Sequence, residues 1–238
     1  TPATARECFL RSAKRTVRRR VRDAAGWPVA DPDGKPQYEE RPVSPTTCAQ
    51  ALVEVRSAWA WGVGRGMVKG NPWTAVKPLG HRRRRKVQHH RDEARAFLDA
   101  AIAQAATGDE SALCLAAVLI LGTRPGEVLY RQVRDLDDHG ATLCIDESKT
   151  DASARRLAIP AFLQPQLAAL ADGKAPTDFL FAHRGESVLL KAAERICERA
   201  GVPRAVPYAL RGTHASLSIE EGATSRTEVI VDFMAVLE

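Results

Sequence analysis

Leu121-Gly-Thr-Arg-Pro-Gly-Glu-Val-Leu129 is the stretch that decides how the fold is interpreted. It follows an apolar run over residues 112–121, which predicts a central buried helix. Pro125 suits the first position of a helix, because its missing N–H would have no partner there. We therefore expect Arg124 at the turn where one helix ends and the next begins, with Glu127 three residues later. An arginine at such a turn either pairs with an acid as part of the structure or binds an anion.

The length and charge of the chain set the class of protein. Its 238 residues allow one or two domains, and 45% hydrophobic residues are enough to bury a core. Lys and Arg outnumber Asp and Glu by 35 to 29, and ten of these cations gather in two short runs. Such a run is typical of a nucleic-acid contact or of a solvated face. The ten are Lys14, Arg15, Arg18, Arg19, Arg20, Arg82, Arg83, Arg84, Arg85 and Lys86.

The cysteines and the hydropathy favour a cytoplasmic protein without cofactor or metal. Five cysteines, with no CxxC pair, argue against a disulfide framework or a zinc site. We recognise no signal peptide in these residues and expect no membrane span, because the longest apolar run, residues 112–121, is too short to cross a membrane. The adjacent His89 and His90 have no third metal ligand nearby, so we expect a solvent-exposed pair. The chain opens on Thr1, which is compatible with a piece of a longer product.

The first block, residues 1–80, is expected to be a small helical domain. Residues 3–23 favour a helix whose positive charges, including Arg15, Arg18 and Arg19, gather on one side, where a polyanion would relieve their repulsion. Residues 24–45 are rich in Pro and Gly, and their flanks are expected as a short hairpin or a loop.

A second helix of this block is predicted over residues 47–64. Leu52, Val55, Trp59 and Val63 fall on one stripe, so we expect Trp59 in the core and Trp61 at its rim. Residues 81–91 lack apolar periodicity and lie between two periodic blocks. We therefore expect an extended basic linker in which Arg82, Arg83, Arg84, Arg85 and Lys86 contact phosphates.

The second block, residues 92–238, reads as mainly helical with a small antiparallel sheet. Apolar stripes predict helices over 92–102, 112–121, 161–171, 189–200 and 207–222. Two short strands are expected over 142–145 and 156–159, and the polar loop between them carries Lys149. Residues 135–140 are expected as a loop. No Walker loop, GxGxxG, GxSxG or HExxH motif occurs, which removes the common nucleotide-binding, hydrolase and zincin interpretations.

Three separated motifs now stand in one order. They are Gly-Thr-Arg-Pro-Gly-Glu at 122–127, Ser-Lys-Thr at 148–150, and Tyr-Ala-Leu-Arg at 208–211 followed by Gly-Thr-His-Ala-Ser. This order and spacing resemble the tyrosine recombinases, the phage-integrase and Xer-like family. The resemblance implies a DNA breaking-rejoining catalytic core over 92–238, incomplete at its C-terminal end. It also implies an N-terminal helical core-binding domain over 1–80, joined to the core by the linker over 81–91.

The resemblance also implies a role for each residue. Arg124 and Arg211 correspond to the two arginines that clamp the scissile phosphate, and a guanidinium suits this task because its planar fork donates two parallel bonds. Glu127 would orient Arg124 from behind. Lys149 corresponds to the hairpin lysine that protonates the leaving 5′-oxygen, whereas without the arginines it would be a solvated turn residue.

Two parts of the family pattern are absent from the expected places. Tyr208 stands where the family has a histidine, three residues before the second arginine, and its phenol could still donate a hydrogen bond to a phosphate oxygen. The nucleophilic tyrosine is not matched, since the three tyrosines are Tyr38, Tyr130 and Tyr208. His214 follows Arg211 on the next turn and is expected to be a packing or capping residue.

These departures leave three interpretations open. The chain is a truncated relic, a fragment whose tyrosine lies elsewhere or comes from a partner, or a regulator that occupies attachment sites. In each case we expect a protein of site-specific recombination or integration that binds double-stranded DNA, with other recombinase protomers as further partners and no membrane. Tyr208 and the unmatched nucleophile predict that these 238 residues do not cleave DNA by themselves.

Overall fold

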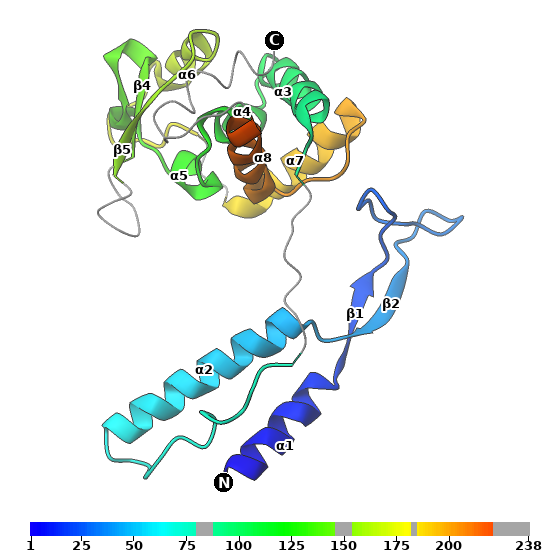
Figure 1. Cartoon of the computed structure of the whole chain (residues 1–238). Coiled ribbons are helices and arrows are strands. Elements are labelled where there is room, and N and C mark those ends of the chain that lie inside the picture. Colours follow the sequence, from blue (N-terminus) through cyan, green and yellow to red (C-terminus); the bar gives the residue numbers. More distant parts are fainter. Residues whose placement is uncertain (80–87, 146–153, 182–184, 221–238) are drawn as a thin grey trace. The chain divides into compact units, whose positions relative to one another are not determined.

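The computed structural model describes residues 1–79, 88–145, 154–181 and 185–220 (Figure 1). Backbone contacts divide the chain into two compact units, Thr1–Arg85 and Lys86–Glu238. Each unit is built around its own set of helices. The finer division into domains over 1–80 and 92–238 with a linker between them stays a prediction.

The first unit consists of two helices with a β-ribbon between them. Helix α1 (Pro2–Ala13) and helix α2 (Pro45–Gly64) both have Pro in the first turn and a hydroxyl cap in front of it. Thr1 Oγ1 accepts the Thr4 N–H at 3.4 Å, and Ser44 Oγ accepts the Thr47 N–H at 3.1 Å, which satisfies otherwise unpaired donors. The small core of this unit consists of Ala5, Phe9, Cys48, Leu52 and Val76.

The single helix predicted over residues 3–23 is wrong. Helix α1 ends at Ala13, and strand β1 (Thr16–Arg20) pairs antiparallel with strand β2 (Tyr38–Pro42). β-Branched residues at 16 and 17 favour extended backbone, and in a strand successive arginines point to opposite faces instead of stacking on one side of a helix. Arg15, Arg18 and Arg19 are therefore not on one helical face. The alternative of a hairpin for the flanks of 24–45 is confirmed.

The predicted second helix is confirmed, but its predicted stripe is only partly buried. Leu52 is buried, whereas Trp59 and Val63 are 37% and 38% exposed and Trp61 is 58% exposed. Trp59 donates its indole N–H to the Gly70 carbonyl at 3.0 Å, so it holds the segment that returns along α2. The rim position that was expected for Trp61 fits its exposure, and Trp59 belongs to the rim as well.

The second unit is centred on helix α4 (Glu110–Leu121). Residues 112–121 are at most 3% exposed, which matches the prediction of a helix that is apolar all round. It packs against helices α3 (Arg91–Ala105), α7 (Glu186–Ala200) and α8 (Pro207–Glu220), and leads into the short helix α5 (Pro125–Leu129) (Figure 1).

A three-stranded antiparallel sheet lies beside these helices. Strands β3 (Leu136–Asp137), β4 (Thr142–Ile145) and β5 (Arg155–Ala158) pair in that order, with Leu143 opposite Leu136 on one side and Leu157 on the other. Two 3-10 turns, η1 (Val133–Asp135) and η2 (Asp138–Gly140), flank β3, and helix α6 (Gln164–Ala171) follows the sheet. Residues 136–137 were expected in a loop, because a two-residue strand shows no alternation in the sequence.

The mainly helical fold with small antiparallel sheets confirms the fold class predicted from the sequence. Across the ranges that the structure describes, no helix is both long and apolar enough to span a bilayer.

Candidate functional site

The turn between α4 and α5 places Arg124 next to helix α8. Gly122 ends α4 in the left-handed conformation with φ of 60°, and Arg124 is the N-cap of α5. A Cβ on Gly122 would lie 2.4 Å from Cδ2 of His214, which belongs to α8. Glycine is therefore required both by the backbone conformation and by the close approach of α8. This local geometry confirms the prediction that Arg124 lies at the turn where one helix ends and the next begins.

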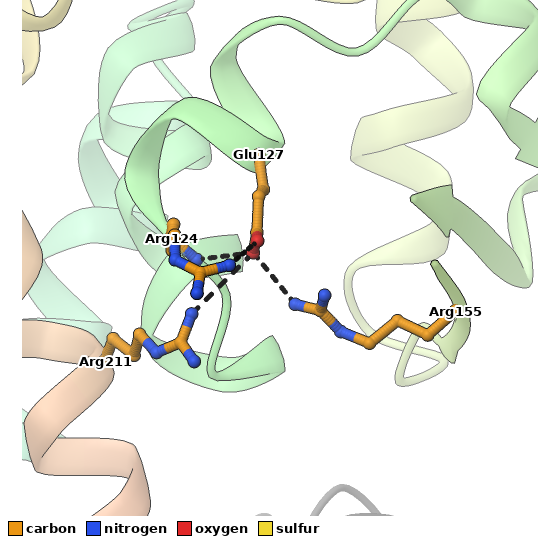
Figure 2. A network of polar contacts seen from close by, with 4 residues as sticks. All are labelled: Arg124, Glu127, Arg155 and Arg211. Atoms are coloured by element: carbon orange, nitrogen blue, oxygen red, sulfur yellow. Dashed lines mark hydrogen bonds and ion pairs between the residues drawn. The ribbon is translucent and has the colours of Figure 1, made fainter. Parts of the chain in front are cut away.

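Glu127 is the centre of the site (Figure 2). Its side chain is only 8% exposed, and its carboxylate accepts the Arg124 backbone N–H at 2.8 Å and the Arg124 Nη1 at 2.5 Å. Arg155 Nη2 donates to Glu127 Oε2 at 2.8 Å, and Arg211 Nη1 lies 3.8 Å from the same oxygen. One carboxylate thus gathers three guanidinium groups from helix α5, strand β5 and helix α8.

The charges of this cluster do not balance. Three guanidinium groups and one carboxylate leave a surplus of two positive charges. Arg211 Nη1 is buried and has no hydrogen-bond partner within the described residues, whereas the Arg124 side chain is 44% exposed. A site with surplus cations and an unsatisfied buried donor is suited to an oxyanion, because arginine binds such groups through paired N–H donors.

The protonation equilibria follow from the same contacts. Burial acts to raise the pKa of Glu127, but hydrogen bonds from Arg155 and from the backbone and side chain of Arg124 outweigh it and lower the pKa to about 2. Burial and then the neighbouring Arg124 lower the pKa of Arg211. Glu127 is therefore ionised at neutral pH, and the mutual repulsion of the two arginines is an energy that a bound anion would relieve.

Tyr208 belongs to the same cluster. It lies on α8 one turn before Arg211 and is 47% exposed. The pKa of Arg124 is raised by the hydrogen bond and charge of Glu127 first, and also by the charge of Tyr208 and a side-chain hydrogen bond with it. The phenol therefore lies within hydrogen-bonding reach of the first arginine.

The structure brings together four of the predicted site residues: Arg124, Glu127, Tyr208 and Arg211. Lys149 and the basic run Arg82, Arg83, Arg84, Arg85 and Lys86 lie outside the described residues, so their roles stay predictions. Arg15, Arg18 and Arg19 belong to the first unit.

Arg155 is the member of the cluster that the sequence analysis missed. Strand β5 alternates between a half-buried Arg155, an exposed Arg156 and a buried Leu157. The strand was predicted over 156–159, so Arg155 lay just outside it; extending the alternation by one residue would have placed Arg155 on the face of Leu157, but not against Glu127. Arg156 points the other way and pairs with Asp137 at 3.1 Å.

His214 links helix α8, which carries Arg211, to helix α4. It is 4% exposed, and its Nδ1 lies 2.9 Å from the Leu119 carbonyl oxygen, which matches the predicted packing role. Burial lowers the pKa of His214 most, and the charge of Arg211 lowers it further. The hydrogen bond to Leu119 acts in the opposite direction, and the resulting pKa is about 4. The imidazole is therefore neutral at physiological pH and holds α8 against α4.

The expectation of an exposed histidine pair is wrong for His89. This side chain is buried, its ring centroid lies 5.7 Å from that of Phe97, and its backbone N–H donates to Thr213 Oγ1 at 3.0 Å. Apolar packing against α3 and a backbone bond to α8 tie residues 88–90 to the second unit. Gln88 adds a bond from Ser216 Oγ at 2.8 Å. The flanking sequence gave no periodicity that could predict this.

The helical unit, its small sheet and the paired arginines on one carboxylate are the arrangement expected from the resemblance to the tyrosine recombinases. In sequence, the tyrosine recombinase XerC of Mycobacterium sp. (strain KMS) is 28% identical to this chain over 196 residues, which cover 76% of this chain and 65% of that protein. The chain thus spans just under two thirds of the length of this relative. No family model matches the chain.

Solved structures share the fold. The Tn1549 transposon integrase (residues 82–397) in complex with circular intermediate DNA has a TM-score of 0.63 at 13% identity, covering 100% of this chain and 76% of that one. A lambda integrase (75–356) dimer bound to a COC′ core site has a TM-score of 0.55 at 16% identity, covering 77% and 74%. The similarity in sequence to XerC, together with the shared fold of these integrases, supports the tyrosine recombinase and integrase family for this chain.

Proposed function

We propose that this chain binds double-stranded DNA and acts in site-specific recombination or integration, with a backbone phosphate held between Arg124 and Arg211. The observation that carries the proposal is the convergence of these two guanidinium groups, from α5 and α8, on the buried Glu127 with positive charge in surplus. Integrases of the same fold that are solved in complex with DNA, one as a dimer, support duplex DNA and further protomers as partners. The five cysteines all lie within the described residues and none of them forms a disulfide, which supports the cytoplasm as the compartment.

In this proposal each side chain has a task. Glu127 accepts both the side chain and the backbone N–H of Arg124, so it fixes the direction of that guanidinium before the phosphate arrives. Arg211 offers the buried Nη1 donor, which a phosphate oxygen would satisfy. In-line attack at phosphorus builds negative charge on the non-bridging oxygens, and donors that are already in place stabilise that charge. Tyr208 adds a phenol beside Arg124, and Lys149 would supply the general acid.

Binding to a fluorescein-labelled duplex, measured by anisotropy over a range of salt concentrations, tests this proposal. Each lost phosphate contact reduces the slope of log K against log[salt] by about 1. Arg124→Gln and Arg211→Gln are each expected to show this loss and weaker binding. Arg195→Gln is the matched control, because Arg195 is exposed and pairs with Asp109 at 2.8 Å on the opposite end of α4. Equal slopes for all three variants would refute the phosphate site.

Strand cleavage is the second candidate function, favoured by the same arginine pair. We propose instead that these 238 residues bind without cleaving, since Tyr208 replaces the family's histidine and only Tyr38, Tyr130 and Tyr208 could act as a nucleophile within them. A suicide duplex that traps covalent intermediates distinguishes the two. A covalent protein–DNA adduct with this chain alone, abolished by Phe at one of the three tyrosines, establishes cleavage. An adduct only after mixing with a full-length relative indicates a tyrosine from a partner.

A further inference from the structure

The β1–β2 ribbon of the first unit carries four arginines and two glutamates (Figure 1). Every residue of β1 and all of β2 except Glu39 are exposed. Beyond the strands the chain continues into two tight turns, over residues 23–27 and 31–35. A two-stranded ribbon gains little stability from its own packing, so a ribbon that is exposed on both faces is an element that a partner can cover.

The two faces of the ribbon carry the same formal charge. The register places Thr16, Arg18, Arg20, Tyr38 and Glu40 on one side, here called the Tyr38 face. The opposite side, called the Val17 face, carries Val17, Arg19, Glu39 and Arg41. Each face has two arginines and one glutamate, so formal charge alone does not tell them apart.

The two faces differ in the contacts that their arginines make within the ribbon. On the Val17 face, Arg41 forms an ion pair with Glu39 at 2.6 Å. On the Tyr38 face, the guanidinium carbons of Arg18 and Arg20 lie 4.4 Å and 5.9 Å from the centroid of the Tyr38 ring.

Neither Arg18 nor Arg20 forms an ion pair within the described part of the chain. Glu40 lies opposite Arg18, but its carboxylate accepts the Thr16 hydroxyl at 3.4 Å. The Tyr38 face therefore presents two guanidinium groups that form no ion pair within the described residues, and Glu40 is the one acid that the register places on this face.

We propose that the Tyr38 face of the ribbon binds a groove of duplex DNA; this inference rests on the proposed function and adds a second contact surface to it. A two-stranded ribbon fits the major groove, whose width is about 12 Å. Arg18 and Arg20 are two positions apart on one strand, so they point the same way at roughly 7 Å spacing. The aromatic ring holds both guanidinium groups in place, which reduces the entropy lost when they bind phosphates.

Two double variants with the same change of charge test the choice of face. Arg18→Gln with Arg20→Gln removes both cations of the Tyr38 face, and Arg19→Gln with Arg41→Gln removes both cations of the Val17 face. Each is compared with the unaltered chain on a mixed-sequence duplex of about 30 base pairs, roughly three helical turns. The Tyr38-face variant is expected to lose about 2 from the salt slope, and the Val17-face variant less than half of that.

The outcomes separate this inference from the proposed function. Equal losses from both variants show a diffuse charge effect and overturn the face-specific contact, and no loss from either shows that the ribbon does not touch DNA. If the unaltered chain binds and Arg211→Gln weakens binding, the phosphate site stands even when the ribbon contact falls. If the unaltered chain does not bind duplex DNA, both fall together.

A measurement on the unaltered chain removes any dependence on the folding of variants. Modification by an arginine reagent, followed by mass spectrometry with and without the duplex, compares neighbouring residues in one molecule. DNA is expected to protect Arg18 and Arg20 several-fold more than Arg19. Equal modification of all three in the presence and absence of DNA contradicts the proposal.

Discussion

Arg155 Nη2 donates a hydrogen bond to Glu127 Oε2 at 2.8 Å, which joins the first residue of strand β5 to helix α5 (Figure 2). The sheet is thereby tied to the same carboxylate that orients Arg124. Position 155 immediately follows the segment between β4 and β5 that carries the predicted Lys149. Arg155 thus acts through Glu127 as a positioning residue for the arginine pair.

Replacement of Arg155 by Met is expected to destabilise the fold by about 1–3 kcal/mol, because a hydrogen bond to a buried carboxylate is lost. Arg156→Met is the matched control in the same strand, since the Arg156 side chain is 61% exposed and pairs with Asp137. An exposed pair contributes about 1 kcal/mol at most. Urea unfolding at pH 7 measures both, and equal midpoints would show that the Arg155 bond contributes nothing.

Glu127→Gln is expected to separate stability from DNA binding. It leaves three guanidinium groups without a counter-charge, so the folded state should lose about 2–4 kcal/mol, somewhat less than for a fully buried ion pair. The surplus positive charge at the site rises at the same time, so at low salt the affinity for duplex DNA should not fall in parallel with stability. Urea unfolding and anisotropy on one preparation check this, and a loss of affinity as large as that of Arg211→Gln contradicts it.

The same carboxylate gives a prediction for acid conditions. The folded-state pKa of Glu127 is about 2, below its ordinary value of 4.5, so its contribution to stability is present above pH 4.5 and is lost as the pH falls toward 2. In Glu127→Gln this part of the acid transition should be missing. An unchanged dependence of unfolding free energy on pH between 4.5 and 2 would show that the carboxylate is not stabilised by the arginines.

The lowered pKa of His214 predicts a second range, at higher pH than that of Glu127, in which the free energy of unfolding depends on pH. Its pKa is lowered from 6.5 to about 4 by burial, so the unfolded chain binds a proton in this range and the folded chain does not. Stability is therefore complete above pH 6.5 and decreases as the pH falls toward 4, by about 3 kcal/mol at most. His214→Gln should flatten this slope. Unfolding free energies measured at several pH values test it, and parallel curves for both proteins count against a neutral buried imidazole.

Local sequence signals predicted the arginine site, but they did not predict the residues that hold it in place from distant parts of the chain. A proline and a glycine determine the turn at Arg124, and Tyr208 and Arg211 lie one helical turn apart on α8. Both features could therefore be predicted from the sequence. Arg155 reaches Glu127 across 28 positions, and His89 reaches Thr213 across 124. Such contacts depend on how α4, α8 and the sheet pack together, and no short-range pattern encodes them.

The β1–β2 ribbon shows why the predicted secondary structure of residues 16–20 was wrong. The arginines at 18–20 are good helix formers, but Thr16 and Val17 favour extended backbone, and the strand at 38–42 offers a pairing partner that places Glu39 opposite Arg19. Cross-strand pairs between opposite charges stabilise a sheet, whereas like charges one turn apart weaken a helix. Tertiary pairing therefore overrides the local preference, and only knowledge of both strands could have predicted it.

Gly122→Ala tests how closely α8 must approach the arginine turn. Two costs add: a left-handed backbone for alanine, about 1–2 kcal/mol, and the contact of 2.4 Å between the new Cβ and Cδ2 of His214. Gly201→Ala is the matched control, because Gly201 also ends a helix with φ of 68° and a Cβ there meets nothing within 4 Å. Gly122→Ala should therefore destabilise the fold by at least about 1 kcal/mol more than Gly201→Ala, since overpacking typically costs 1–3 kcal/mol.

The close contact also predicts how the two positions interact. In a double-mutant cycle, His214→Ala removes the ring that the new methyl group would meet, so Gly122→Ala should cost less in that background than in the unaltered chain. Because α8 carries Arg211, Gly122→Ala should also weaken duplex binding, whereas Gly201→Ala should not. Equal destabilisation by Gly122→Ala in both backgrounds, measured by urea unfolding, would show that the imidazole is not what confines position 122 to glycine.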